Sequence, residues 1–127
     1  MTLVDVAVGF CKKGHRPYQE DALFPALEDV KASNQIWVVC DGVGGNPCGG
    51  RASQLVSNKT AEYLQKNPDA TALCTYLDQT VAQHASETKS CRGMATTLTF
   101  LQCLNEGIRI GWCGDSRIYQ FRDGEIL

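Results

Sequence analysis

Four carboxylates stand beside predicted turns, and their chemistry indicates a site for divalent metal ions. They are Glu20, Asp21, Asp41 and Asp115. Carboxylates that are buried together without partners repel one another and lose hydration, at a cost on the order of several kcal/mol each, which bound cations can offset. Oxygen ligands without histidine or thiolate suit magnesium or manganese, because both are hard cations. The backbone carbonyl of Gly42 is a candidate for a further ligand.

Each charged candidate also has an ordinary structural explanation. An aspartate that follows a strand and precedes glycine is most often a turn residue, which applies to Asp41, and Asp115 has a similar setting. Glu20 and Asp21 are adjacent, so in a strand their side chains point to opposite faces, and one of them is expected to be solvated or structural. Arg16 is by default a surface residue. The histidines, serines and threonines lack the spacing of a triad, a zinc site or a nucleophile elbow.

The strongest structural signal in the chain surrounds Asp41. Residues 36–40 form an apolar run, Ile-Trp-Val-Val-Cys, whose β-branched and aromatic side chains are typical of a buried strand. Five glycines follow within residues 42–50, where they leave room beside the main chain for a ligand. Asp41 is therefore predicted to lie where a strand ends and a ligand loop begins.

This glycine loop fits neither of two nucleotide-binding patterns well. A GxGxxG match that starts at Gly42 fails because Pro47 takes the position of the last glycine. A phosphate-loop match that starts at Gly45 meets Arg51 and Ala52 where lysine and a hydroxyl residue are needed. Nucleotide binding stays open as a low-ranked alternative.

Hydrophobic periodicity predicts the elements that position these residues. Strands are expected over residues 2–10, 19–24, 36–40, 93–104, 107–113 and 117–121, with turns at 105–107 and 123–124, and helices over 49–66 and about 69–88, the second capped by Asp69. Strands, a helix pair and further strands predict an α+β fold, a layered antiparallel β-sandwich flanked by an antiparallel helix pair. The sequence stops just after an Asp-Gly turn, so we expect the sandwich to be incomplete at its C-terminus.

Composition narrows the classes of function. The 127-residue chain carries 12 basic and 14 acidic side chains, and its net charge of −2 gives no electrostatic reason to bind nucleic acid or a membrane. The apolar runs are shorter than the roughly twenty residues of a spanning helix, and residues 1–10 have no basic start. One cytoplasmic domain over residues 1–127 is the expectation.

The seven cysteines form no CxxC pair and no zinc spacing, and an odd number cannot pair completely. We therefore expect reduced thiols. Cys40, Cys103 and Cys113 lie in apolar runs and are expected to behave as small hydrophobes. Cys48 lies in the glycine loop, where oxidants could reach it, but an inert thiol is the simpler prediction.

Three segments in order resemble one family, the metal-dependent serine/threonine protein phosphatases of type 2C (PPM), particularly its bacterial branch. Residues 16–22, RPYQEDA, are similar to its arginine and Glu-Asp-Ala segment. Residues 38–45, VVCDGVGG, with 49–53, GGRAS, are similar to its Asp-Gly-x-Gly-Gly loop and following helix. Residues 93–98, GMATTL, and 114–126, GDSRIYQFRDGEI, look like its Gly-x-x-x-Thr hairpin and Gly-Asp-Ser-Arg strand. Each segment alone is weak, but together they are specific and span almost the whole chain.

The resemblance implies a metal centre of two manganese or magnesium ions, with a third, weaker ion. Asp41 would bridge the two ions, and the carbonyl of Gly42 would bind one of them. Glu20 would hold metal-bound water. Asp115 would help to bind the third ion, and Asp21 would support the cluster.

The resemblance also implies the reaction, hydrolysis of phosphoserine and phosphothreonine esters in proteins. Arg16 would hold the substrate phosphate with its planar, permanently charged fork of donors, and Arg16 and Asp41 would be the catalytic residues. A water that bridges the ions would attack phosphorus in line. Phosphorylated proteins, among them a cognate kinase or its substrates, would be the partners in a bacterial signalling role.

Three departures from the family pattern affect this expectation. Gln19 stands where bacterial members often have asparagine. Val43 stands where many eukaryotic members have histidine, so a proton donor to the leaving group must come from elsewhere. The family's later aspartates would lie beyond Leu127, so we expect an N-terminal fragment with weak activity or none. Its exposed strand edges could pair with another copy. The alternative function is a phosphatase-like regulatory domain that binds phosphoproteins without turnover.

Overall fold

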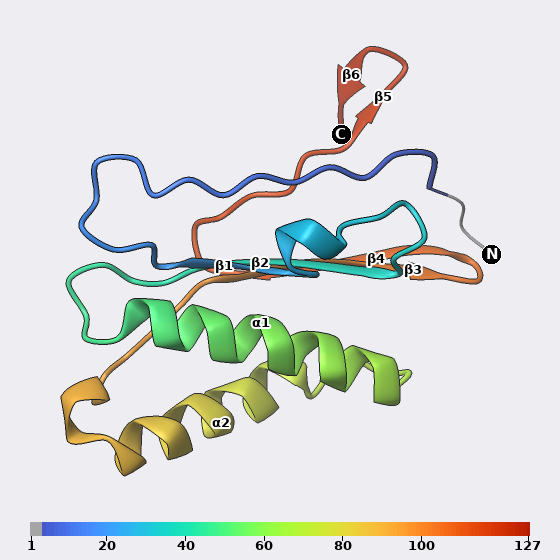
Figure 1. The fold of residues 1–127 in the computed structure, drawn as a ribbon. Coiled ribbons are helices and arrows are strands. Elements are labelled where there is room, and N and C mark those ends of the chain that lie inside the picture. The colour runs from blue at the N-terminus through green and yellow to red at the C-terminus, as the bar shows by residue number, and fades with distance from the viewer. Residues whose placement is uncertain (1–3) are drawn as a thin grey trace.

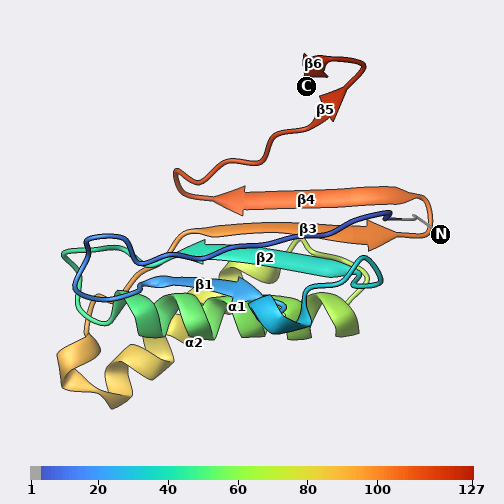
Figure 2. The same cartoon turned by 45° about the horizontal axis from the view of Figure 1, so that its top comes forward.

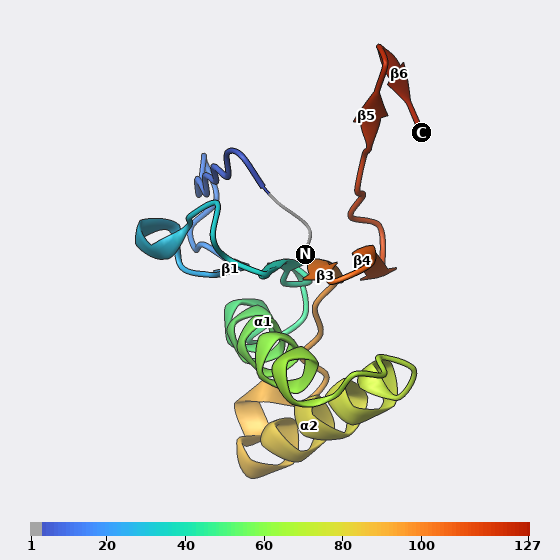
Figure 3. The ribbon, with the colours of Figure 1, turned by 90° about the vertical axis from the view of Figure 1, so that its right-hand side faces the viewer.

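The computed structural model describes residues 4–127, in which a four-stranded antiparallel sheet carries two helices on one face (Figure 1). The elements are β1 (Asp21–Phe24), η1 (Leu27–Asp29), β2 (Ile36–Asp41), α1 (Gly49–Lys66), α2 (Leu73–Glu87), η2 (Lys89–Cys91), β3 (Leu98–Leu104), β4 (Gly107–Cys113), β5 (Phe121–Arg122) and β6 (Glu125–Ile126). The predicted α+β class and the antiparallel helix pair are confirmed. Of the two sheets of a sandwich, the described residues form one, and β5 and β6 make a separate hairpin that projects from it (Figure 3).

The sheet has the order β1-β2-β3-β4, and all neighbouring strands are antiparallel (Figure 2). The strands predicted at 36–40 and 107–113 are present, and the second begins and ends where predicted. The strand predicted at 93–104 starts only at Leu98. The strand predicted at 117–121 is wrong, because the chain leaves the sheet at Gly114, whose φ of +112° suits glycine, and pairs again only at β5.

The first predicted strand, 2–10, is also wrong over the part that can be compared. Residues 2 and 3 lie outside the described part of the chain. Residues 4–10 run extended above the sheet face opposite the helices (Figure 1) but form no strand with any other described residue. Alternating hydrophobicity predicts the side-chain pattern of a strand, whereas the strand itself needs a hydrogen-bonding neighbour. Val8 is accordingly 88 % exposed and Phe10 83 %.

Helix α1 matches the predicted bounds because its buried positions recur every three or four residues. Those positions are mostly small: Gly49, Ala52, Ser53, Val56, Ser57, Thr60, Ala61 and Leu64. Small side chains let the helix axis come close to β1 and β2. Within the described residues, neither helix has the length and apolar character needed to cross a bilayer.

Helix α2 begins at Leu73, four residues later than predicted, and Asp69 does not cap it. Asp69 Oδ1 accepts the Thr71 amide proton (2.9 Å) in the preceding turn, which uses the carboxylate before the helix starts. Leu73 and Leu77 of α2 then complete a core with β2, β3 and α1. Tyr63 and Tyr76 join the two helices, with ring centroids 5.1 Å apart.

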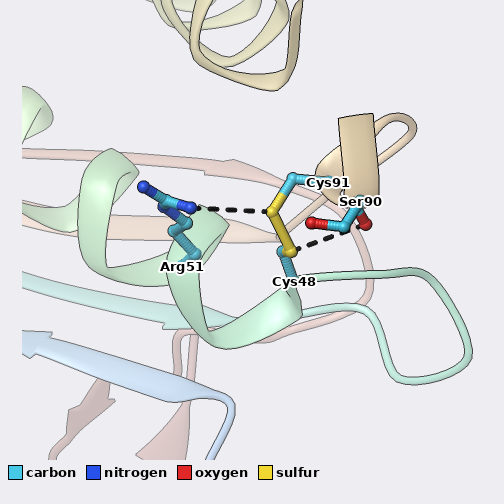
Figure 4. Close-up of a disulfide and its surroundings, with 4 residues drawn as sticks. All are labelled: Cys48, Arg51, Ser90 and Cys91. Atoms are coloured by element: carbon cyan, nitrogen blue, oxygen red, sulfur yellow. Dashed lines mark hydrogen bonds between the residues drawn. A yellow bond between two sulfur atoms is a disulfide. The ribbon is translucent and has the colours of Figure 1, made fainter. Parts of the chain in front are cut away.

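The prediction that all the cysteines are reduced is wrong. Cys48 and Cys91 form a disulfide (Figure 4). An odd number of cysteines excludes complete pairing, but it does not exclude a single pair. Cys40 and Cys103 are buried as small hydrophobes, as predicted. Cys113 is exposed, because it is the last residue of the edge strand β4.

Candidate metal centre

A cavity of about 440 Å³ lies where β1 begins and β2 ends, and every residue predicted for the site lines it. These residues come from the segment before β1, from β1 itself, from the end of β2 and from the segment after β4. They are Arg16, Glu20, Asp21, Asp41, Gly42 and Asp115. Folding therefore brings together segments that lie almost a hundred residues apart along the chain, as the sequence led us to expect.

Two carboxylates face each other across the strand pair. Asp21 and Asp41 are register partners of β1 and β2, and cross-strand partners in an antiparallel pair share one face of the sheet. Burial raises the pKa of Asp21, and a hydrogen bond with Asp41 and the charges of Asp41 and Glu20 raise it further, while Arg16 opposes the shift. The cavity is lined by four carboxylates against three cations, Lys12, Lys13 and Arg16, and this excess of negative charge favours a bound cation.

The beginning of α1 contacts Glu20 directly. Its carbonyl oxygen accepts the Gly42 amide proton (2.9 Å) and the Ser53 hydroxyl proton (2.6 Å). A Cβ on Gly49 would overlap Glu20 Oε2, and a Cβ on Gly42 would overlap the Gly49 carbonyl group. Both glycines are required by these close approaches, which place the helix terminus directly against the Glu20 carboxylate.

Thr97, which was not among the predicted site residues, fixes the backbone of Asp41. Asp41 donates its amide proton to Thr97 Oγ1 (2.9 Å), and Thr97 donates its own amide proton to the Asp41 carbonyl (2.9 Å). Thr97 Oγ1 also lies 3.1 Å from Ser116 Oγ. A Cβ on Gly114 would come within 2.7 Å of Thr97 Cγ2, so the chain before Asp115 packs on the same threonine. The available signal was the Gly-x-x-x-Thr segment, whose threonine is Thr97.

The donor atoms fit hard divalent cations in type, but the set of ligands is small. Carboxylates and the Gly42 carbonyl offer oxygen only, which suits manganese or magnesium. Within residues 4–127, no three acidic, histidine or cysteine side chains lie close enough to chelate one ion. Gly44 leaves space for Arg16, because a Cβ there would lie 3.3 Å from Arg16 Nη1. One arginine and an oxygen donor set at one cavity make a place for a phosphate beside metal.

The structure does not support the nucleotide-binding alternative, because the arginine in its loop is directed elsewhere. In that interpretation, Arg51 takes the position of the phosphate-binding lysine. Its Nη1 atom instead lies 3.8 Å from Cys91 Sγ, so the guanidinium is directed at the disulfide (Figure 4).

Comparison with known proteins identifies the family. A sequence profile described as protein phosphatase 2C matches residues 16–127. The chain belongs to the protein phosphatase 2C family. The serine/threonine protein phosphatase PstP of Mycobacterium tuberculosis is 32 % identical to this 2C-family chain over 106 residues, which cover 78 % of the chain and 20 % of PstP.

Solved structures of other proteins share the fold of this chain. The catalytic domain of PstP, in complex with two manganese ions, superposes with a TM-score of 0.68 at 27 % identity, over 98 % of this chain and 54 % of that one. Stp1 from Staphylococcus aureus, at 23 % identity, shares the fold with a TM-score of 0.68, over 100 % of this chain and 52 % of its own. The chain thus spans about half of these solved chains and a fifth of the curated PstP sequence.

Proposed function

We propose that this chain contributes to a metal-dependent phosphoprotein phosphatase that hydrolyses phosphoserine and phosphothreonine esters. The observation that supports this most is that all six candidate residues line one cavity, with a carboxylate pair and one arginine side by side. Residues 1–127 would form the N-terminal part of a single phosphatase domain, since they cover 54 % of the PstP catalytic domain.

Two manganese or magnesium ions would bind at the carboxylate pair, by analogy with the two manganese ions of the PstP structure. Asp41 and the Gly42 carbonyl would bind them directly, and Glu20 through water. Asp115 would hold a third ion. When bound, such cations activate water as a nucleophile and neutralise the oxygens of a phosphate.

The chain's own residues would bind and orient the substrate. Arg16 carries a positive guanidinium that presents parallel N–H donors, which suits two oxygens of a phosphate monoester. Asp21, beside Asp41, would keep that carboxylate in place. The backbone hydrogen bonds from Gly42 to Glu20 and between Asp41 and Thr97 fix the ligand-bearing atoms before any ligand arrives, so little reorganisation is required.

The proposed partners are phosphorylated proteins in the bacterial cytoplasm, including a cognate kinase or its substrates. Neither nucleic acid nor a membrane is expected as a partner, given the net charge of −2. We also propose self-association through β4, the edge strand, because Ile108, Ile110 and Trp112 on it are 45–64 % exposed. Light scattering behind size exclusion would show a dimer, and replacing Trp112 with lysine would return a monomer.

The test of the enzymatic function combines manganese binding with turnover. Calorimetric titration should show saturable manganese binding to residues 1–127, and the full-length parent protein should hydrolyse a phosphothreonine peptide only with manganese present. Asp41→Asn should lose both properties. Asp78→Asn, a matched substitution on α2, should keep both. Equal hydrolysis by the wild type and Asp41→Asn would refute the proposal.

A second function is favoured by one observation, the absence of three chelating side chains at one point within residues 4–127. In that case the cavity would recognise phosphoproteins through Arg16 without turnover. The same experiment separates the two: peptide binding that Arg16→Ala abolishes, with no hydrolysis at saturating manganese, would support the binding function.

A further inference from the structure

The disulfide joins the end of the glycine loop to η2. Cys48 is the last residue of the glycine loop and the N-cap of α1, and Cys91 ends η2 (Figure 4). The two Cα atoms are 5.3 Å apart, although 43 positions separate them in the sequence. No element of the proposed phosphatase mechanism uses this bond.

Hydrogen bonds continue the connection from the disulfide to the cavity. The Asn46 side chain donates to the Gly93 carbonyl (3.1 Å), and the Val43 amide donates to the Ala95 carbonyl (2.9 Å). The disulfide therefore ends a series of links that holds the loop 42–48 against residues 91–97. Between its two ends, the loop is tied to residues 91–97 by these two hydrogen bonds, and a covalent link at its end removes further conformational freedom.

The two sulfur atoms differ in access. Cys91 is 2 % exposed, whereas Cys48 is half-buried and reachable from solvent. Arg51 Nη1 lies 3.8 Å from Cys91 Sγ, so a guanidinium stands ready to stabilise a thiolate on Cys91. Cys48 Sγ lies 3.7 Å from the Ser90 carbonyl oxygen, to which it can donate a proton only as a free thiol. An incoming thiolate would therefore attack Cys48, because that sulfur is the accessible one. Cys91 would be the better leaving group, because Arg51 stabilises its thiolate.

We propose that Cys48–Cys91 is a thiol-exchange site that a dithiol reductant opens, and that its state sets the order of the loop carrying Asp41 and Gly42. A thiolate of the reductant attacks Cys48 Sγ, the S–S bond breaks, and its electron pair leaves on Cys91 Sγ. The second thiol of the reductant then attacks the mixed disulfide and releases Cys48. The protein gains two electrons and two protons, and the reductant becomes a cyclic disulfide.

Loosening of the loop reaches the cavity through α1. Gly49 follows Cys48 directly and lies against Glu20 Oε2, so a shift of the helix terminus moves the contacts of that carboxylate. The effect on metal rests on the proposed function, whereas the exchange and the change in loop order do not. Reduction should therefore weaken manganese binding without unfolding the sheet or the helix pair.

The first experiment measures loop order in both redox states by hydrogen exchange with mass spectrometry. Reduction with dithiothreitol, and separately the double variant Cys48→Ser with Cys91→Ser, should speed amide exchange in residues 42–50 by about tenfold or more and leave β3 unchanged. Equal exchange of residues 42–50 in all forms would overturn the proposal. A difference in exchange without manganese binding in either state would leave this proposal standing and refute the metal centre.

The second experiment tests which sulfur is attacked. The wild-type protein is treated with reduced glutathione, the released thiols are blocked with iodoacetamide, and the mixed disulfide is located by peptide mapping. Glutathione should be attached to Cys48 several times more often than to Cys91. Arg51→Gln should slow reduction of the wild-type disulfide several-fold, while Lys66→Gln at the other end of α1 should not. Faster attack on Cys91, or no effect of Arg51→Gln, would overturn the proposed direction of exchange.

Discussion

Replacing Thr97 with valine tests whether the backbone of Asp41 is held for metal binding. The substitution keeps the shape of the side chain but removes the oxygen that accepts the Asp41 amide proton at 2.9 Å. The amide is partly buried, so leaving it without a partner should cost about 1–2 kcal/mol of folding free energy. For a domain of this size, that is a fall in melting temperature of roughly 3–8 °C.

Thr99→Val is the matched control, because Thr99 lies two residues further along the chain, in β3, and is as buried as Thr97. Its hydroxyl donates to the Val39 carbonyl (2.8 Å), and its removal leaves no donor unsatisfied. Its cost should be about 0.5–1.5 kcal/mol, so the two variants overlap in stability. They should differ at the site: only Thr97→Val should speed hydrogen exchange at the Asp41 amide.

Manganese affinity supplies the second measurement of this prediction. If metal binding loses the same free energy as folding, Thr97→Val should lower the manganese affinity by about 5–30-fold. Thr99→Val should change that affinity little. Both quantities are measured on the same samples, by NMR exchange without metal and by calorimetry with manganese. Equal Asp41 exchange and equal affinity in the two variants would refute the proposed role of Thr97.

Three further predictions test the charge, the buried thiol and the sheet packing. Asp21→Asn should raise the melting temperature of the metal-free protein at neutral pH, because the raised pKa of Asp21 means that folding disfavours its charged form; no rise would contradict this. Burial raises the pKa of Cys40 to about 12, so iodoacetamide at about pH 9 should label the exposed Cys113 and spare Cys40 until the protein unfolds, as peptide mapping would show. Gly111→Ala should lower stability by about 1–3 kcal/mol in urea titration, because its Cβ would overlap the Phe100 ring, and an unchanged midpoint would contradict this.

Local patterns were sufficient to predict the central elements of the fold. The run 36–40 and the helical spacing of 49–66 each carry their own signal, and β2 and α1 lie where those signals place them. The failures concern features that depend on a neighbour. Residues 4–10 have the alternation of a strand without a paired strand among the described residues. Asp69 has the type of a capping residue, but the turn at Thr71 takes its carboxylate first.

The candidate site divides in the same way. The position of Asp41 and Gly42 at the end of β2 was predictable because a strand end followed by glycine has a local sequence signature. Thr97 was not, because its role exists only where β3 runs beside β2 and brings a hydroxyl to the Asp41 amide. The Cys48–Cys91 bond was not predictable either, since pairing across 43 positions depends on where η2 packs.

One physical constraint connects the glycine loop, the helix and the disulfide. Because α1 presents Gly49, Ala52 and Ser53 to the sheet, it approaches closely enough for Ser53 to bond the Glu20 carbonyl (2.6 Å). At that distance no side chain fits on Gly49, so nothing buffers Glu20 against movement of the helix terminus. The terminus is fixed by its first cap residue, Cys48, and hence by the disulfide. Breaking the disulfide at the partly exposed Cys48 should therefore act on the Glu20 carboxylate through the backbone of the helix terminus. A larger residue at position 49 should move that terminus away from Glu20.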